Sequence, residues 1–327
     1  MRRRAFIGVI YGAAAALPFA AAAQQPGEVW RIGHVTVATP EISRIFAQAL
    51  EQGLTDLGYV RNRNIVLLHR NPAPQPDKIE EVIISLAPEV DLLVVWGSIA
   101  GIAAKRLASA KPIVFLTIGF PVEIGLVQSL AHPGRNITGI AAEAATETNE
   151  KRLQILKEIV PDLNRVAVLR AVDDQYVGFA MASLELAASK LGVNLLPVDI
   201  QSLGDLELAF ASMKKSAAEA LIVPGAALVF TLNRQIADLA LAAHMPSCHM
   251  FREAVVAGGL VSLAPDRLAM TRSAAAQIDK IIKGTSPADI PVEQPTRLEL
   301  CINLKTARLL NLTIPPTLLA RADEVIE

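Results

Sequence analysis

Short apolar runs alternate with amphipathic segments along the chain from Trp30 onward. Apolar runs at 31–37, 64–70 and 91–96 are separated by segments such as 42–57, whose apolar residues recur with the period of a helix. This alternation is typical of repeated βαβ units that build a parallel sheet. The sequence therefore predicts an α/β fold.

A second series of the same kind begins at 165–170, after a stretch of small and polar residues. Two such series predict two lobes of similar construction. We expect lobe 1 to comprise residues 30–140 and 260–292, and lobe 2 to comprise 141–259 and 296–327. With the strand at 259–263 and the helix at 267–283 returning to lobe 1, the chain would cross between lobes three times at the hinge.

The stretch from Lys111 to Gly139 organises the first lobe. Residues 112–116 read as a buried strand, 122–130 as a short amphipathic helix, and 136–140 as a second strand. The loop Thr117–Pro121 lies between the first strand and the helix, at the carboxyl end of the strand. In an open α/β sheet, ligands bind at that end.

Two further turns of the first lobe follow predicted strands. Thr39 and Pro40 suit the N-cap and first position of a helix, and the same free amides could equally bind a ligand carboxylate. Gly97-Ser98 offers close backbone approach and a hydroxyl to a ligand. Its G-S-x-x-G spacing differs from the G-x-S-x-G of a nucleophile elbow, so a catalytic serine is not expected.

The second lobe offers similar turns after its strands. Asp173 and Asp174 could hold a cationic group, although capping of the next helix is the favoured interpretation. Arg252 could bind a carboxylate in a bidentate pair, or bond to Glu253 or to the lobe surface. His249, on an apolar strand, is expected to be a satisfied core residue.

The first residues have the organisation of an export signal. Three arginines at 2–4 precede the apolar run 8–16, and small residues at 21–23 form a cleavage pattern before Gln24. The sequence R-R-A-F-I resembles a twin-arginine signal, with Sec export as the alternative. We therefore expect a signal peptide over residues 1–23, cleavage near Ala23 and a periplasmic mature protein.

Composition narrows the function classes. The formal net charge of −1 gives no electrostatic case for nucleic-acid binding. Cys248 and Cys301 could form one bridge, but buried free thiols fit their apolar surroundings equally well. The sequence carries no spacing typical of a metal site, a dinucleotide fold or a phosphate loop, so no cofactor is expected.

Several segments carry a resemblance to a known family. They are P-I-V-F…G-x-P-V…G-L-V-x-S-L-A-x-P-G-x-N-I-T-G within 111–139, G-L-x-x-L-G-Y at 53–59, F-R-E…A-G-G-L at 251–260, and the tail at 290–327. Together they are very similar to ABC transporter substrate-binding proteins of the tryptophan or aromatic amino acid type. The resemblance implies a type I periplasmic binding protein, with two Rossmann-like lobes joined by a three-crossover hinge. It also implies a small-molecule ligand, passed to a membrane permease and its ATPase.

Carried onto this sequence, the resemblance places the ligand in the cleft between the lobes. The residues expected to bind it are Thr39, Pro40, Glu41, Gly97, Ser98, Ile99, Gly119, Phe120, Pro121, Asp173, Asp174, Gln175, Tyr176, Pro224, Gly225, Phe251 and Arg252. The family usually has G-D-P where this chain has 119–121, so an acid that could meet a ligand ammonium is absent. Trp96, Phe120 and Tyr176 could instead favour an aromatic or apolar carboxylate, so we expect either this ligand class or an amino acid.

These observations predict a solute-binding component of an ABC importer that closes about its hinge on an amino acid or an aromatic or apolar carboxylate. The alternative from another class is a secreted α/β enzyme that acts on a small molecule.

Overall fold

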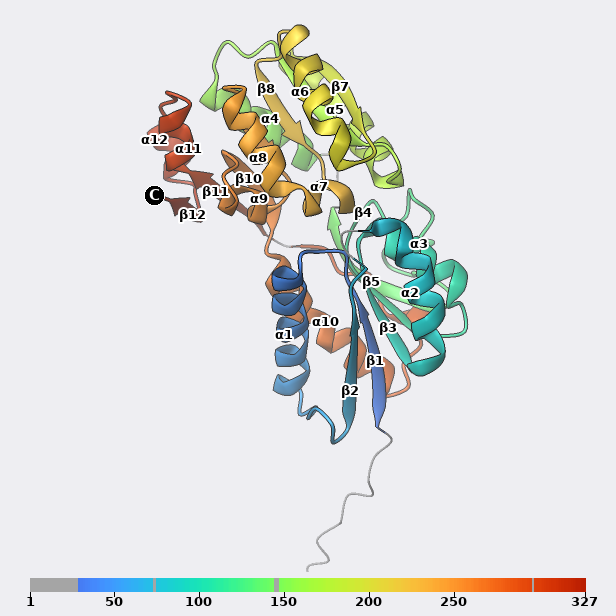
Figure 1. Cartoon of the computed structure of the whole chain (residues 1–327). Helices are drawn as coiled ribbons and strands as arrows, with labels where there is room; N and C mark the ends of the chain where they lie inside the picture. Colours follow the sequence, from blue (N-terminus) through green and yellow to red (C-terminus); the bar gives the residue numbers. More distant parts are fainter. Residues whose placement is uncertain (1–28, 73–74, 144–146, 296) are drawn as a thin grey trace, which may run out of the picture.

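The computed structural model describes residues 29–72, 75–143, 147–295 and 297–327. The predicted signal peptide therefore lies outside the described residues. Within them the chain forms two lobes, each with its own sheet, drawn as the lower and upper halves of Figure 1. No helix of this described part is long and apolar enough to cross a membrane.

The lower lobe holds a five-stranded sheet in the order β2-β1-β3-β4-β5, with every pair parallel. Its strands are β1 (Trp30–Val35), β2 (Ile65–Arg70), β3 (Leu92–Trp96), β4 (Ile113–Gly119) and β5 (Ile137–Glu143). Its helices are α1 (Pro40–Asp56), α2 (Ile79–Leu86), α3 (Gly97–Leu107) and α10 (Arg267–Ile282), with 3-10 turns at Pro76–Lys78, Ala87–Glu89 and Pro287–Asp289.

The upper lobe holds a seven-stranded sheet in the order β12-β11-β10-β9-β8-β6-β7, parallel except for the pair β10 and β11. Its strands are β6 (Arg165–Ala171), β7 (Asn194–Ile200), β8 (Ala220–Val223), β9 (Ser247–His249), β10 (Val261–Pro265), β11 (Leu298–Asn303) and β12 (Glu324–Ile326). Its helices are α4 (Glu147–Ile159), α5 (Gln175–Leu191), α6 (Leu206–Lys215), α7 (Ala227–Thr231), α8 (Asn233–Ala242), α9 (Arg252–Val256), α11 (Leu304–Leu309) and α12 (Pro316–Leu319), with a 3-10 turn at Leu203–Asp205.

The local signals of the sequence explain most of these boundaries. Thr39 caps α1, and Pro40 stands at its first turn, as predicted. The Asp174 carboxylate accepts the Tyr176 amide and so caps α5, and Gly192 ends that helix with φ 65°. The central strand β3 is buried along its whole length, which fits its continuous apolar sequence.

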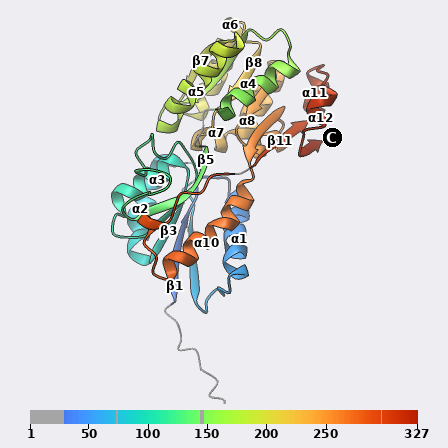
Figure 2. The same ribbon diagram turned by 180° about the vertical axis from the view of Figure 1, so that it is seen from behind.

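Three crossings join the lobes, as predicted. The chain passes from β5 to α4, from β10 to α10, and from the 3-10 turn at 287–289 to β11. Helix α10 lies beside α1 in the lower lobe in both views (Figures 1 and 2). The hydroxyl of Tyr59, in the segment that follows α1, donates to the Asp279 carboxylate of α10 at 2.9 Å.

Three predicted features differ from the structure. Strand β10 pairs with β9 and β11 in the upper sheet, so only α10 returns to the lower lobe and the predicted boundary at residue 260 is too early. Similarly, β5 continues to Glu143, past the predicted boundary at 140. The predicted helix at 122–130 is a series of turns, because Phe120 and Gly125 take positive φ and Pro121 accepts the amides of Leu126 and Val127.

Cys248 and Cys301 are both buried and unbridged. Burial raises the pKa of the Cys248 thiol to about 12 and that of Cys301 to about 12, so both stay protonated. The interpretation as free core thiols is confirmed.

The contact between α1 and α10 depends on a glycine. A Cβ on Gly53 would lie 2.3 Å from the Arg272 carbonyl oxygen and 3.0 Å from the Ala275 Cβ. A Cβ on Gly178, an exposed glycine of α5, would meet nothing within 4 Å. The same substitution at these two helical positions should therefore have opposite effects.

We predict that Gly53→Ala lowers the free energy of unfolding by roughly 1–3 kcal/mol through overpacking. Gly178→Ala should raise it by about 0.5–1 kcal/mol because alanine favours the helix. Denaturant unfolding of both variants measures the difference. Two variants with stabilities shifted in the same direction would contradict this account of the helix pair.

Candidate functional site

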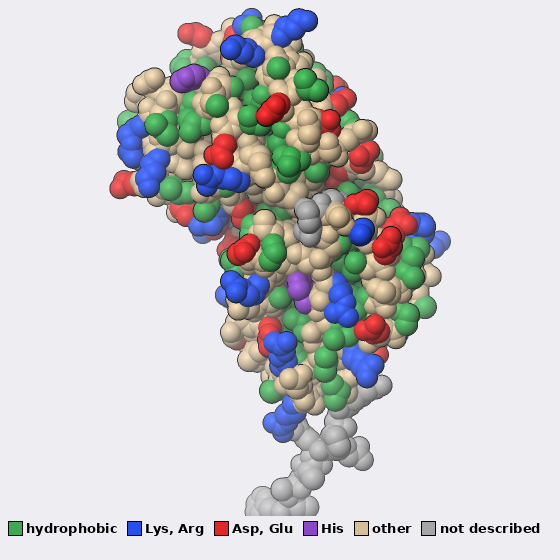
Figure 3. Space-filling model, in the orientation of Figure 1, with side chains coloured by type: hydrophobic (Ala, Val, Ile, Leu, Met, Phe, Trp, Pro, Cys, Tyr) green, Lys and Arg blue, Asp and Glu red, His purple; other side chains and the backbone are tan. Residues whose placement is uncertain are grey.

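A pocket lies between the two lobes, where the carboxyl ends of both sheets face each other. The space free of protein atoms measures about 570 Å³, counting its open mouth. The outline of the molecule narrows between the lobes at this level (Figure 3). The lining residues are Thr36, Val37, Ala38, Phe46, Trp96, Gly97, Ser98, Thr117, Gly119, Asp174, Tyr176, Gly225, Ala226, Ala227, Phe230, Met250, Phe251 and Arg267.

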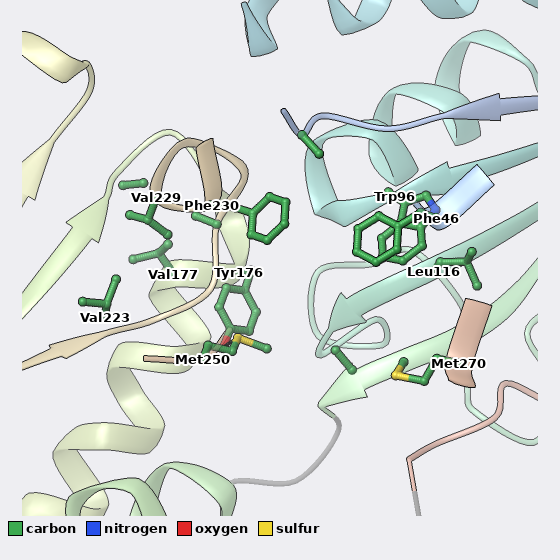
Figure 4. Close-up of a cluster of buried hydrophobic side chains, with 14 of the residues drawn as sticks. Phe46, Trp96, Leu116, Tyr176, Val177, Val223, Val229, Phe230, Met250 and Met270 are labelled. Carbon is green, nitrogen blue, oxygen red and sulfur yellow. Dashed lines mark hydrogen bonds between the residues drawn. The ribbon is translucent and has the colours of Figure 1, made fainter. Parts of the chain in front are cut away.

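Aromatic rings from both lobes form the apolar walls. In the lower lobe, Phe46 of α1 stacks on Trp96 at the end of β3, with ring centroids 4.1 Å apart. In the upper lobe, Phe230 of α7 meets Phe251 edge to face at 4.8 Å. Figure 4 shows Phe46 and Trp96 on one side of the gap and Phe230 on the other. A flat apolar group would find ring faces on either side.

The Arg267 guanidinium lies among these four rings. Its central carbon is 4.3 Å from the Phe230 centroid, 4.7 Å from Phe251, 4.9 Å from Phe46 and 5.3 Å from Trp96. The side chain is 9% exposed, and its burial lowers the pKa of the guanidinium. The rings' negative faces stabilise the cation.

Arg267 has few polar partners for a buried charge. One terminal nitrogen lies 3.4 Å from the Glu253 carboxylate, which is a long contact, and Nε has no hydrogen-bond partner in the described part of the chain. A buried cation with an unpaired donor carries a desolvation cost that a bound anion would offset. Arg267 is thus the strongest anion-binding candidate among the described lining residues.

Asp174 joins the lobes across the pocket. Its carboxylate accepts the Ser98 hydroxyl of the lower lobe at 2.5 Å, the Tyr176 amide at 3.1 Å and the amide of Ala227. Burial raises the pKa of Asp174, and these hydrogen bonds oppose that shift. Ser98 also stands in the first turn of α3, whose N-terminal end favours a negative charge. The carboxylate is therefore compensated by the protein itself.

A second buried network lies at the hinge, behind Tyr176. Glu143, the last residue of β5, accepts the Tyr176 hydroxyl at 2.7 Å and the Arg152 guanidinium at 3.0 Å. The side chains of Arg152 and Glu143 are 2% and 0% exposed. Arg152 also donates to the Leu263 carbonyl oxygen at 3.0 Å. This ion pair joins a strand of the lower lobe to a helix of the upper lobe.

A chain of hydrogen bonds leads from the pocket wall into the lower lobe and back. The Trp96 indole, which can only donate, bonds His34 Nε2 at 2.9 Å. His34 Nδ1 must then carry the hydrogen and donate to His69 Nδ1 at 3.0 Å, and His69 Nε2 donates to Ser43 at 2.6 Å. The Ser43 and Thr36 hydroxyls share a hydrogen bond of 2.5 Å in which either oxygen can be the donor. The chain thus ends at the Thr36 hydroxyl, which lines the pocket.

Seven of the predicted ligand-binding residues line this pocket. They are Gly97, Ser98, Gly119, Asp174, Tyr176, Gly225 and Phe251. The other predicted positions lie beside it, outside the lining: Thr39, Pro40, Glu41, Ile99, Phe120, Pro121, Asp173, Gln175, Pro224 and Arg252. The favoured interpretation of Asp174 as a helix cap is confirmed.

Arg252 departs most from its predicted role as a carboxylate ligand. Its guanidinium donates to the Glu324 carboxylate of β12 at the surface, through Nε and a terminal nitrogen. Phe120 is buried and packs on Tyr176 with centroids 5.9 Å apart. His249 is a buried core residue that bonds Ser247 at 2.9 Å, as expected.

Sequence reasoning missed Arg267, Phe46, Phe230 and Thr36. Phe46 lies on the inner face of a helix and reads as core. Arg267 follows β10, which was assigned to the wrong lobe, so its position at the end of a strand facing the cleft went unrecognised. The sequence did contain a signal. Arg267 comes directly after Pro265, which ends β10, and Asp266, which caps α10.

The described residues contain no group of three or more His, Cys, Asp or Glu side chains placed to hold a metal ion. Ser98 donates directly to a carboxylate, without an intervening histidine.

Comparison with known proteins places this geometry in context. A model of the family described as ABC transporter substrate binding protein matches residues 35–326. A tyrosine-binding protein of Clostridioides difficile is 24% identical over 270 residues, which cover 82% of this chain and 75% of that protein.

Solved structures share the fold. A Streptococcus pneumoniae ABC domain in complex with L-Trp superposes with a TM-score of 0.85 at 21% identity, covering 91% of this chain and 100% of that one. A conserved domain protein from Vibrio cholerae gives a TM-score of 0.85 at 23% identity with the same coverage. The ligand-free, open structure of a substrate-binding protein with adhesive properties from Clostridium difficile gives 0.67 at 20% identity, covering 91% and 99%.

The buried imidazole of His34 predicts a pH dependence of stability. Burial and the neighbouring His69 lower the pKa of His34 to about 3. Unfolded His34 takes up a proton below about pH 6.5, while the folded side chain stays neutral until about pH 3. The contribution of His34 is therefore complete above pH 6.5 and is lost as the pH falls toward 3.

Between pH 7 and pH 5 this group alone should lower the free energy of unfolding by about 2 kcal/mol. Denaturant unfolding at both values, for the wild type and His34→Asn, isolates its share, because the variant should show the shallower decline. NMR of the His34 ring should show no protonation down to pH 5. A titration midpoint near 6.5 would show that the hydrogen-bond chain has been assigned wrongly.

Proposed function

Because this chain belongs to the ABC transporter substrate-binding protein family, we propose that it is the periplasmic solute-binding component of an importer. Its two lobes close about the hinge on a small organic ligand, either an amino acid or an aromatic or apolar carboxylate. The closed protein then delivers the ligand to a membrane permease and its ATPase.

The observation that carries this proposal is the pocket between the carboxyl ends of the two parallel sheets. Both lobes contribute ring faces and polar groups to it, so a ligand contacts both when they are closed. Ligands of open α/β sheets bind at that edge. Two proteins similar to this chain are described as binding tyrosine and L-Trp, and the aromatic walls fit ligands of that size and flatness.

The hinge supports a closure mechanism. Three chain segments join the lobes, and the rest of the contact between them runs through side chains such as Ser98 and Asp174. Such a link breaks and forms as rigid lobes rotate. The ligand-binding residues we propose are the seven predicted ones that line the pocket, together with Thr36, Phe46, Trp96, Phe230 and Arg267.

The proposed periplasmic location is supported by the export signal predicted for residues 1–23, and the proposed permease and ATPase by the family's role in transport. The rival function, a secreted α/β enzyme, would require turnover of the bound compound. Purified protein incubated with its ligand should leave that ligand chemically unchanged by mass spectrometry.

Tryptophan fluorescence offers a direct test of ligand binding. Trp96 lines the pocket, while Trp30, the other tryptophan, begins β1 at the opposite end of that sheet from the pocket. We predict that an aromatic amino acid or aromatic carboxylate changes the emission of the wild type with saturable dose dependence. In Trp96→Phe the change should disappear, although the thermal shift produced by the same ligand persists.

A matched control is Trp30→Phe, which should keep the ligand-dependent change. The proposed function would be contradicted if no amino acid or small carboxylate altered emission or raised the melting temperature, and native mass spectrometry of the purified protein found no retained solute.

A further inference from the structure

The polar group left unpaired in the pocket wall is a hydrogen-bond donor. Arg267 Nε has no hydrogen-bond partner among the described residues. A ligand that satisfies this donor must present an acceptor. A carboxylate does so with full negative charge and suits the fork of a guanidinium.

The acids near the pocket are already compensated. Asp174, the one acidic side chain among the described lining residues, holds the Ser98 hydroxyl and two backbone amides. Glu143 lies behind Tyr176 and pairs with the buried Arg152. Neither carboxylate is therefore available to a ligand ammonium. The least compensated charge in the pocket, that of Arg267, is also positive.

Arg267 is balanced only by Glu253, at 3.4 Å, and by ring faces. An ammonium beside this guanidinium would be repelled at low local dielectric, while a carboxylate would gain a charge-assisted hydrogen bond. Phe120 also places an aromatic ring, not an acid, beside Tyr176. The electrostatics of the pocket therefore separate acids from amino acids.

We propose that the ligand is a small carboxylate with an aromatic or apolar body and no α-ammonium group, and that Arg267 binds its carboxylate. Aromatic and apolar lining residues beside the guanidinium then contact the body of the ligand, and the Thr36 hydroxyl lies in the same lining. This inference rests on the proposed function, because it names the solute class of the same pocket.

Ligand pairs that differ only in the α-ammonium group test the proposal. Calorimetric titration compares 3-phenylpropanoate with phenylalanine, 3-(4-hydroxyphenyl)propanoate with tyrosine, and indole-3-propanoate with tryptophan. In at least one pair the acid should bind tenfold or more tightly than the amino acid. The neutral amide of that acid should also lose tenfold or more in affinity.

Two substitutions of opposite sign test the role of Arg267. Arg267→Gln should weaken binding of the acid at least tenfold and leave the affinity of its neutral amide nearly unchanged. Glu253→Gln removes the competing carboxylate and should tighten binding of the acid severalfold. Arg267→Met keeps apolar contact with the four rings, so it controls for folding: a folded Arg267→Met that no longer binds the acid separates recognition from stability.

The outcomes distinguish this inference from the proposed function. Amino acids bound as tightly as their deamino acids, or unchanged acid affinity in Arg267→Gln, would overturn the carboxylate inference and leave the solute-binding function intact. If no compound of any pair binds, the inference is also overturned, and native mass spectrometry for a retained solute decides the function separately.

Discussion

The direction of parallel β-strands is the constraint on which the pocket depends. Every neighbouring pair in the lower sheet is parallel, as are the pairs joining β6, β8 and β9 in the upper sheet, so the carboxyl ends of these strands form one edge in each lobe. The three crossings hold the two edges face to face. The carboxyl ends of β3 and β4 and the turns after β1, β6, β8 and β9 consequently supply lining residues, although they are far apart in the sequence.

Buried charged side chains at these facing edges determine which ligand can bind. These side chains differ in how far the protein compensates their charge. Glu143 and Arg152 neutralise each other at the hinge, where replacement of one partner would leave the other charge buried and alone. Asp174 is compensated by hydroxyl and amide donors. Arg152 keeps an unpaired Nη2 beside this ion pair, and Arg267 keeps an unpaired Nε among aromatic rings at the pocket. A binding protein gains affinity from such incomplete compensation, because the ligand supplies what the empty pocket lacks.

The sequence predicted the fold through signals that act locally. Apolar runs located the strands, and a cap such as Thr39 located the start of a helix, because both depend on neighbouring residues. The helix predicted at 122–130 failed because its apolar spacing suited a helix, whereas Phe120 and Gly125 adopt positive φ. The lobe to which β10 belongs could not be read from its residues, since an apolar strand suits either sheet.

The residues of the binding site could be predicted only as far as the order of the strands could be predicted. Turns following strands gave Gly97, Ser98, Asp174 and Gly225, because any parallel strand points its end toward the cleft. Which side chain of a turn enters the pocket depends on tertiary contacts. Arg252 turns to Glu324 because β12, an element absent from the prediction, brings that carboxylate beside it.

Tyr176 connects the pocket to the hinge. Its ring lines the pocket and lies so close to Gly119 that a Cβ there would be 2.3 Å from it, while its hydroxyl bonds Glu143. Since Glu143 ends a strand of the lower lobe and pairs with a helix of the upper lobe, rotation of the lobes must move Tyr176 relative to Gly119 or to Glu143. The Tyr176 ring thus lines the ligand pocket, and its hydroxyl bonds a residue at the hinge about which the lobes close. Binding and closure are coupled through packing, because close-packed neighbours cannot shift independently.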